Sequence, residues 1–236
     1  MIEPLVLLPG LMCDARLFEA QITALSHDRA VTVAPITGGE RIEEIASGLL
    51  DQLPHRFALC GFDLGGGVAL EIVRRAPERV TRLCLLATDA QVDTPLIAAG
   101  REELIVGALT GQLDEVMRKV IGSDMLAPGP RRIPILNDVL QMAEALGPDV
   151  FVRQMRTQQR RPDQHGTFRR IRVPTLVICG AHDVEIPVRR HAFIADLIPD
   201  ADLRVIDEAG HFPTLETPET VNALLQGWLQ VPLSLV

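Results

Sequence analysis

The sequence predicts an α/β protein with a mainly parallel sheet that is covered by helices on both faces. Short, continuously apolar runs alternate with helix-like segments along most of the 236 residues. Strands of a parallel sheet are buried on both faces, so they are apolar along their whole length. Apolar residues make up 47% of the chain, which is enough for one substantial core.

Six strands are expected from these runs, at residues 5–8, 30–36, 57–62, 80–87, 174–179 and 201–206. The first run ends at Pro9-Gly10, and Asp14 then has the position and side chain of a helix N-cap, predicting a helix to about residue 25. Residues 41–53 form an amphipathic pattern with Ile42, Ile45 and Leu49 on one face. Further helices are expected at 68–75, 188–197 and 218–229.

The alternation breaks between about residues 91 and 172. Only helices are predicted there, at 102–109, 112–121, 135–146 and 149–159, while Thr94-Pro95 has the character of a loop. We therefore expect a core formed by residues 1–90 and 173–236, with residues 91–172 as an all-helical cap inserted into the same domain. Open α/β sheets bind ligands at the carboxyl ends of their strands, where such a cap would form a lid.

Composition and charge narrow the function classes. The net charge of −8 makes nucleic acid an unfavourable partner, and no segment reaches the ~20 apolar residues of a membrane helix. The amino terminus lacks the basic region of a signal peptide. The four cysteines form no CxxC pair, which favours a reduced, cytoplasmic protein. No set of His, Cys and Asp has metal-ligand spacing, so no metal or organic cofactor is expected; oligomeric state is left open.

The most informative segment is Gly61-Phe62-Asp63-Leu64-Gly65-Gly66, between a predicted strand and a helix. It matches a nucleophile elbow, a sharp strained turn that exposes its apex side chain above the sheet. The glycines let the strand and the helix approach each other closely. Serine is the usual apex residue, whereas this chain has Asp63.

Two further motifs follow the last two predicted strands. Gly180-Ala181-His182-Asp183 comes after the fifth, and Gly210-His211-Phe212-Pro213 after the sixth. The chain order Asp63, Asp183, His211 is that of nucleophile, acid and histidine on an α/β-hydrolase sheet. Because all three follow strands at their carboxyl ends, we expect them to meet in one crevice.

With these motifs, the whole chain resembles the α/β-hydrolase superfamily, and in particular small bacterial members of the 3-oxoadipate enol-lactonase and carboxylesterase type. The segment Leu7-Leu8-Pro9-Gly10-Leu11 also matches, although Pro9 replaces the usual His. The resemblance implies that the backbone N–H groups of Leu11 and Leu64 form an oxyanion hole. For Leu64 this agrees with its place at a helix N-terminus, where negative charge is favoured. Some relatives place the acid after the fourth strand, but we expect Asp89 there to be a turn residue.

Asp63 leaves three interpretations open. In the first, it is a nucleophile that forms an alkyl-enzyme ester, as in haloalkane dehalogenases and epoxide hydrolases of this fold; His211 then activates water and Asp183 orients its ring. The auxiliary residues of those enzymes are missing. Leu64 stands where haloalkane dehalogenases have Trp and fluoroacetate dehalogenases have Arg, and the chain has no Tyr to act as the acid of an epoxide hydrolase.

In the second interpretation, an ester or lactone hydrolase has had its serine replaced, naturally or by engineering. Attack by Asp63 on an acyl group would give a mixed anhydride, so the activity on esters would be weak or absent. In the third, the protein binds a ligand without turnover, and Asp63 pairs with a protonated His211. Of the three interpretations, the replaced ester or lactone hydrolase describes the scaffold best. The expected substrates are small, largely apolar organic molecules.

Overall fold

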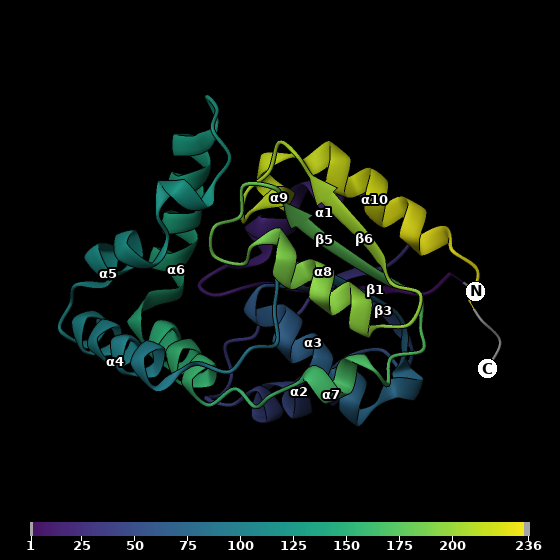
Figure 1. Cartoon of the computed structure of the whole chain (residues 1–236), viewed down its shortest axis with the longest axis horizontal. Helices are drawn as coiled ribbons and strands as arrows, with labels where there is room; N and C mark the ends of the chain where they lie inside the picture. Colours follow the sequence, from purple (N-terminus) through teal and green to yellow (C-terminus); the bar gives the residue numbers. More distant parts are fainter. Residues whose placement is uncertain (1, 234–236) are drawn as a thin grey trace.

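A computed structural model describes residues 2–233 of the chain and contains a single sheet of six parallel strands (Figure 1). The strands lie in the order β2-β1-β3-β4-β5-β6. Their bounds are Leu5–Leu8 (β1), Val31–Val33 (β2), Phe57–Phe62 (β3), Val80–Leu86 (β4), Thr175–Gly180 (β5) and Asp202–Ile206 (β6). All six predicted strands are therefore confirmed, and five of them nearly to the residue.

The second strand is shorter than expected. Instead of spanning residues 30–36, β2 covers only Val31–Val33, because it lies at the sheet edge and pairs with β1 over three positions. β1 has a second partner in β3, with Leu5 opposite Ala58 and Leu8 opposite Gly61. This register brings the loop after β1 next to the end of β3, where the apex residue of the predicted elbow follows.

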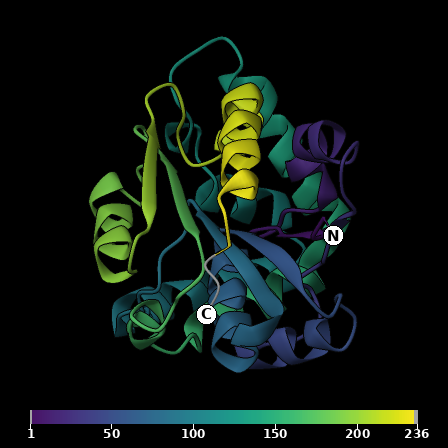
Figure 2. The same ribbon diagram turned by 90° about the vertical axis from the view of Figure 1, so that its right-hand side faces the viewer.

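The helices form two layers on the sheet and a separate group at one end (Figures 1 and 2). In the layers are α1 (Glu19–Leu25), α2 (Ile42–Leu50), α3 (Leu64–Arg75), α7 (His165–Phe168), α8 (Val188–Leu197), α9 (Pro213–Glu216) and α10 (Pro218–Gln230), with 3-10 turns at Ala15–Phe18 and Pro77–Arg79. The end group consists of α4 (Pro95–Leu109), α5 (Leu113–Val120) and α6 (Arg132–Gln159), with a 3-10 turn at Ser123–Met125. Within the described residues, no helix is long and apolar enough to cross a membrane.

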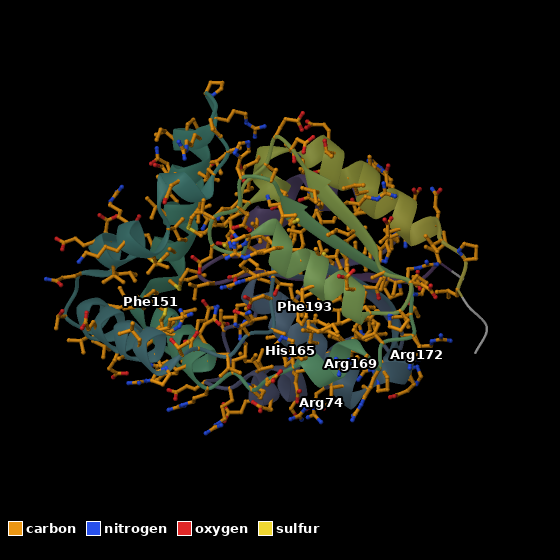
Figure 3. All side chains as sticks on the ribbon, viewed as in Figure 1. Arg74, Phe151, His165, Arg169, Arg172 and Phe193 are labelled. Atoms are coloured by element: carbon orange, nitrogen blue, oxygen red, sulfur yellow. The ribbon has the colours of Figure 1, made fainter. Side chains whose placement is uncertain are left out.

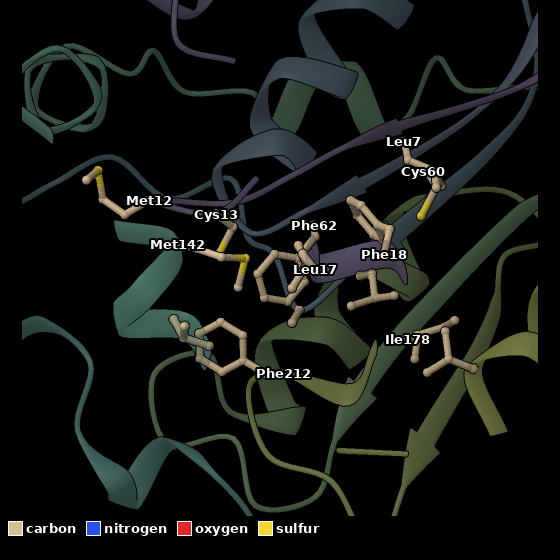
Figure 4. Packing of buried hydrophobic residues seen from close by; sticks show 14 of the residues in the cluster. Leu7, Met12, Cys13, Leu17, Phe18, Cys60, Phe62, Met142, Ile178 and Phe212 are labelled. Carbon is tan, nitrogen blue, oxygen red and sulfur yellow. The ribbon is translucent and has the colours of Figure 1, made fainter. Parts of the chain in front are cut away.

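Two buried clusters account for this layering. Alternate side chains of each strand point to opposite faces, so Val6 and Leu8 pack with α2, α3 and α8, while Leu5 and Leu7 pack toward α1 and α10. The second of these clusters continues into the end group through Met142 and Phe151 of α6. Figure 4 shows Met142 among residues of the sheet and of the 3-10 turn at Ala15–Phe18. Figure 3 marks Phe151 within the helices of the end group.

Helices α4 to α6 of the end group fall within the helical stretch expected at 91–172, whereas α7, near the end of that stretch, packs beside α3 and α8 on the sheet. Two further details differ from expectation. α4 begins at Pro95, because the Thr94 side chain accepts a hydrogen bond from the Ile97 amide and caps the helix. The expectation of a loop at Thr94-Pro95 was therefore wrong at Pro95. Near residue 147 the break between two predicted helices is present as a kink, with Gly147 at φ 79° inside the long α6 and Pro148 after it. We keep the name cap for this group; its boundaries at 91 and 172 stay a prediction.

Candidate active site

The strand β3 passes into helix α3 through Asp63, whose backbone has φ 47° and ψ −118°. A residue with a side chain rarely adopts this conformation, and such strain is typical of functional turns. The Thr88 hydroxyl, after β4, donates to the Asp63 carbonyl at 2.6 Å and helps to hold the turn. The expected elbow is thus present, and α3 starts at Leu64, four residues earlier than predicted.

Close backbone contacts explain the glycines around the apex. A Cβ atom on Gly65 would lie 2.4 Å from the carbonyl oxygens of both Leu8 and Pro9, and one on Gly61 would lie 2.5 Å from the Gly65 carbonyl. Side chains at these positions would push α3 away from β1 and β3. The elbow sequence therefore follows from the close packing of β1, β3 and the start of α3.

His211 and Asp183 lie together at the carboxyl ends of β5 and β6. The His211 Nδ1 is 2.9 Å from Asp183 Oδ2, and each residue is only 4% exposed. The other Asp183 oxygen accepts the backbone N–H groups of Glu185 and Ile186 at 3.0 and 2.9 Å. With both oxygens engaged, Asp183 holds the Nδ1 edge of the ring and leaves Nε2 at the opposite edge.

Aromatic side chains fix the plane of the His211 ring. Phe62, at the end of β3, has its ring centroid 5.3 Å from that of His211, and Phe212 meets the imidazole edge-on at 5.1 Å. Asp89, the alternative acid position, pairs instead with Arg161 and Arg190 at 3.0 and 2.7 Å. Asp183 is therefore the carboxylate that contacts the histidine.

The charge state of His211 is set by competing effects. Burial alone would lower its pKa, but the charge and hydrogen bond of Asp183, with the charges of Asp63 and Glu185, raise the pKa from 6.5 to about 9. The imidazole is therefore protonated at neutral pH. Burial of the Glu185 carboxyl group near His211 raises the pKa of Glu185 above its usual value.

Of the two expected oxyanion donors, Leu11 contacts the apex side chain directly. Its backbone N–H donates to Asp63 Oδ2 at 2.9 Å. Leu64 follows Asp63 at the first position of α3 and is fully buried. The loop that carries Leu11 is anchored by the cap, because the next amide, that of Met12, donates to Oε1 of the buried Gln154 in α6 at 2.8 Å.

A cavity of about 60 Å³ lies over these groups. Its lining includes Asp63, His211, Leu11, Phe62, Phe212 and Glu185 from the core, and Arg101, Val120, Ile121, Met125 and Gln158 from the cap. Sequence reasoning missed Arg101, Gln158 and Glu185, because no pattern in the chain tells which side chains of the cap, or of the loop after β5, face the cavity. Arg101 is held by Asp93 through bonds of 2.5 and 3.1 Å.

Larger hollows lie elsewhere on the molecule. One of about 590 Å³ is formed by the starts of β5 and β6 together with α10, and one of about 740 Å³ lies near the start of β4. Neither is lined by Asp63, Asp183 or His211, so we place the candidate site at the smaller cavity. Residues 2–233 contain no cluster of three or more His, Cys, Asp or Glu side chains that could hold a metal ion.

A parallel sheet with a strained apex between β3 and α3, followed by an acid and a histidine after the last two strands, defines an α/β-hydrolase. The sequence profile of the alpha/beta hydrolase family matches residues 5–224, so the chain belongs to this family and is a hydrolase.

Several relatives support this assignment. A pimeloyl-[acyl-carrier protein] methyl ester esterase of Aromatoleum aromaticum is 30% identical over 200 residues, which cover 80% of each chain. The fold is shared with an esterase from Thermogutta terrifontis, at a TM-score of 0.87 and 24% identity over 97% of this chain and 89% of that one. It is also shared with the enol-lactonase from Burkholderia xenovorans LB400, at 0.85 and 22% over 97% and 92%. Membership of the α/β-hydrolase family is thereby confirmed, and an esterase and an enol-lactonase share the fold.

Proposed function

We propose that the protein hydrolyses small, largely apolar organic molecules through a covalent ester formed on Asp63. The observation that carries this proposal is the hydrogen bond from the Leu11 amide to Asp63 Oδ2. The donor expected to stabilise the oxyanion of an acyl substrate is engaged by the carboxylate of the enzyme itself. This arrangement suits a reaction in which the tetrahedral carbon is the Asp63 carboxyl carbon.

In the first step, Oδ1 of Asp63 attacks a saturated carbon of the substrate. A C–O bond forms, and the bond to the leaving group breaks, with the leaving group keeping the electron pair. Displacement from the rear directs the leaving group away from Asp63 and toward the cap. There the cavity wall carries the Arg101 guanidinium, which is paired with Asp93, and the Gln158 side chain, which offers N–H donors.

In the second step, water attacks the carboxyl carbon of the ester, and His211 accepts the proton of that water. The negative charge develops on Oδ2, where the Leu11 N–H already donates at 2.9 Å. Collapse of this intermediate expels the alkoxide, which takes the proton from His211. The second proton of the water, left on the Asp63 carboxyl group, passes to His211, which restores the Asp63 carboxylate and the protonated ring of the resting site. Asp183 keeps the ring oriented throughout.

The charge balance of the site agrees with this order of events. In the resting site, three carboxylates hold His211 protonated, with a pKa of about 9. Esterification removes the charge of Asp63, so the pKa of His211 falls when a base is needed. We expect the hydrolytic step to accelerate with rising pH and to level off below pH 9, because the pKa of His211 in the ester lies below its resting value and sets when the imidazole is neutral.

A second candidate function is the ester or lactone hydrolase whose serine has been replaced. The relatives favour it, since the 30% identical protein is named as a methyl ester esterase. In that case the Asp63 carboxylate occupies the oxyanion donor and blocks acyl substrates. A binding protein without turnover is the alternative from another class, and calorimetry beside a product assay separates it from both.

One comparison separates the two enzymatic candidates. Wild-type protein and the Asp63→Ser variant are assayed side by side on short-chain p-nitrophenyl esters, with His211→Gln in the serine background as the control. Because the proposed chemistry belongs to the carboxylate, we expect the serine variant to gain at most a small His211-dependent activity. A large gain that is lost with His211→Gln would instead favour the ester hydrolase with a replaced nucleophile.

A further inference from the structure

The carboxylate of Glu216, at the end of α9, holds the backbone on both sides of His211. Its two oxygens accept the Gly210 N–H at 3.0 Å each, and Oε1 also accepts the Phe212 N–H at 2.9 Å. These are charge-assisted bonds to rigid backbone groups, which makes them stronger than ordinary ones. The loop that carries the histidine is therefore fixed by a side chain that the proposed reaction does not use.

The same carboxylate also contacts the cap. Its Oε2 accepts the backbone N–H of Ala127 at 2.7 Å, and the His211 N–H donates to the carbonyl of Met125 at 2.6 Å. The two backbones are in close contact, because a Cβ on Gly210 would lie 2.2 Å from the Met125 oxygen. Segment 125–127 of the cap and residues 210–212 thus share a set of bonds centred on Glu216.

We propose that Glu216 is a positioning residue through which closure of the cap sets the place of the His211 ring. The cavity has only about 60 Å³ beneath Met125 and Ile121, so a larger substrate enters by separating the cap from the core. That separation breaks the bonds from Ala127 and to Met125. The histidine then has its full set of backbone contacts only when the cap is docked. The inference rests on His211 acting in the proposed hydrolysis, whichever chemistry Asp63 performs.

Two variants cut the cap contact and keep the bonds from Gly210 and Phe212 to Oε1. Glu216→Gln keeps one acceptor oxygen for Gly210 and Phe212, but turns an NH₂ group toward the Ala127 amide. Ala127→Pro removes the donor from the other side. Leu126, at φ −104° and ψ 147°, already has the extended backbone that a residue before proline adopts. Glu219→Gln, at an exposed site of α10, is the control for loss of one charge.

The readouts are the NMR titration of the His211 ring and hydrogen exchange of its amide, neither of which requires a known substrate. The pKa of His211 is raised by Asp183, Asp63 and Glu185, and burial opposes them. Loss of the Glu216 charge alone should therefore leave it unchanged, whereas displacement of the ring should lower it from about 9 toward 6.5.

We expect this fall in both variants, together with about tenfold faster exchange at the His211 amide, the effect of weakening by roughly 1.4 kcal/mol. The double variant should show no further change, because both substitutions remove the same bond. A His211 titration that stays at the wild-type value in Ala127→Pro, while exchange rises only in segment 123–127, would overturn the proposal. Equal effects of Glu219→Gln would overturn it as well. Should Glu216→Gln not fold, Ala127→Pro alone decides between these outcomes.

Discussion

The amide of Leu11 and the carboxylate of Asp63 are joined by a 2.9 Å hydrogen bond across 52 residues of sequence. This contact links the loop after β1 to the apex after β3 and decides which oxygen of Asp63 is free to react. The surrounding backbone holds both partners. The predictions below test that support, the charges of the site, and finally the chemistry itself.

The packing of the elbow predicts unequal effects for two neighbouring glycines. Gly65→Ala places a Cβ 2.4 Å from two backbone carbonyls, and we expect it to lower the free energy of unfolding by about 3 kcal/mol or to prevent folding. Gly67→Ala has its closest contact with the flexible end of Ile42 at 3.2 Å, with Gln164 and Arg161 at ordinary contact distances of 3.6 and 3.7 Å, and should change stability by less than about 1 kcal/mol. Urea unfolding measures both. Equal stabilities of the two variants would show that the elbow is not closely packed.

The loop that carries Leu11 is anchored to the cap by the hydrogen bond from the Met12 amide to Gln154, and Gln154→Met removes this bond. The Met12 amide then loses its acceptor in a buried position, which should lower the free energy of unfolding by about 1–3 kcal/mol. Gln141→Met, at an exposed site of the same helix, is the matched control and should have little effect. If the two substitutions have the same effect in urea unfolding, Gln154 does not support the loop.

The raised pKa of His211 predicts how stability depends on pH. A group whose pKa is higher in the folded state binds its proton more tightly there, so its contribution is fully present below pH 6.5 and disappears as pH rises through about 9. At 1.36 kcal/mol per pKa unit, the loss is on the order of 3 kcal/mol. Asp63→Asn removes one of the charges that hold the proton, so its stability should fall less over this range. A wild-type stability that is flat from pH 6.5 to 9 would contradict the charge arrangement.

His191 predicts the opposite behaviour at acidic pH. This side chain in α8 is fully buried, and desolvation lowers its pKa from 6.5 to about 4. The unfolded chain binds the proton more readily, so stability falls as pH drops from 6.5 toward 4. His191→Leu should reduce that loss, while the exposed His27→Leu should not. Thermal unfolding at pH 7 and pH 5 compares the three proteins, and parallel shifts in all of them would refute the assignment.

The sequence allowed the strands, the elbow and the three motif residues to be predicted, because each depends on local pattern. Apolar runs mark the buried strands, and the glycines at 61 and 65 belong to a recognisable motif, although the contacts that require Gly65 reach Leu8 and Pro9 far away in the sequence. The break near Gly147 was also predictable, since the residue before a proline disfavours the helical conformation and glycine readily adopts another one.

Other features depend on how distant segments pack and were not predictable. Arg101 and Gln158 face the cavity only because α4 and α6 lie over the sheet at a particular angle. The role of Gln154 requires the loop after β1 to meet α6, 142 residues away in the chain. β2 was predicted too long because pairing with β1, and not apolar character, sets its length.

The central claim is that Asp63 carries a covalent ester during turnover, and mass spectrometry of His211→Gln tests it most directly. This variant lacks the base for the second step, so it should accumulate the ester when incubated with a panel of small alkyl halides and epoxides. Asp63→Asn in the same background is the control. We predict a mass increase equal to the alkyl group less one hydrogen for a halide, or to the whole epoxide for an epoxide, located at Asp63 by peptide mapping and absent from the control. An unmodified Asp63 with every member of the panel, together with a large gain of ester hydrolysis in Asp63→Ser, would contradict the account.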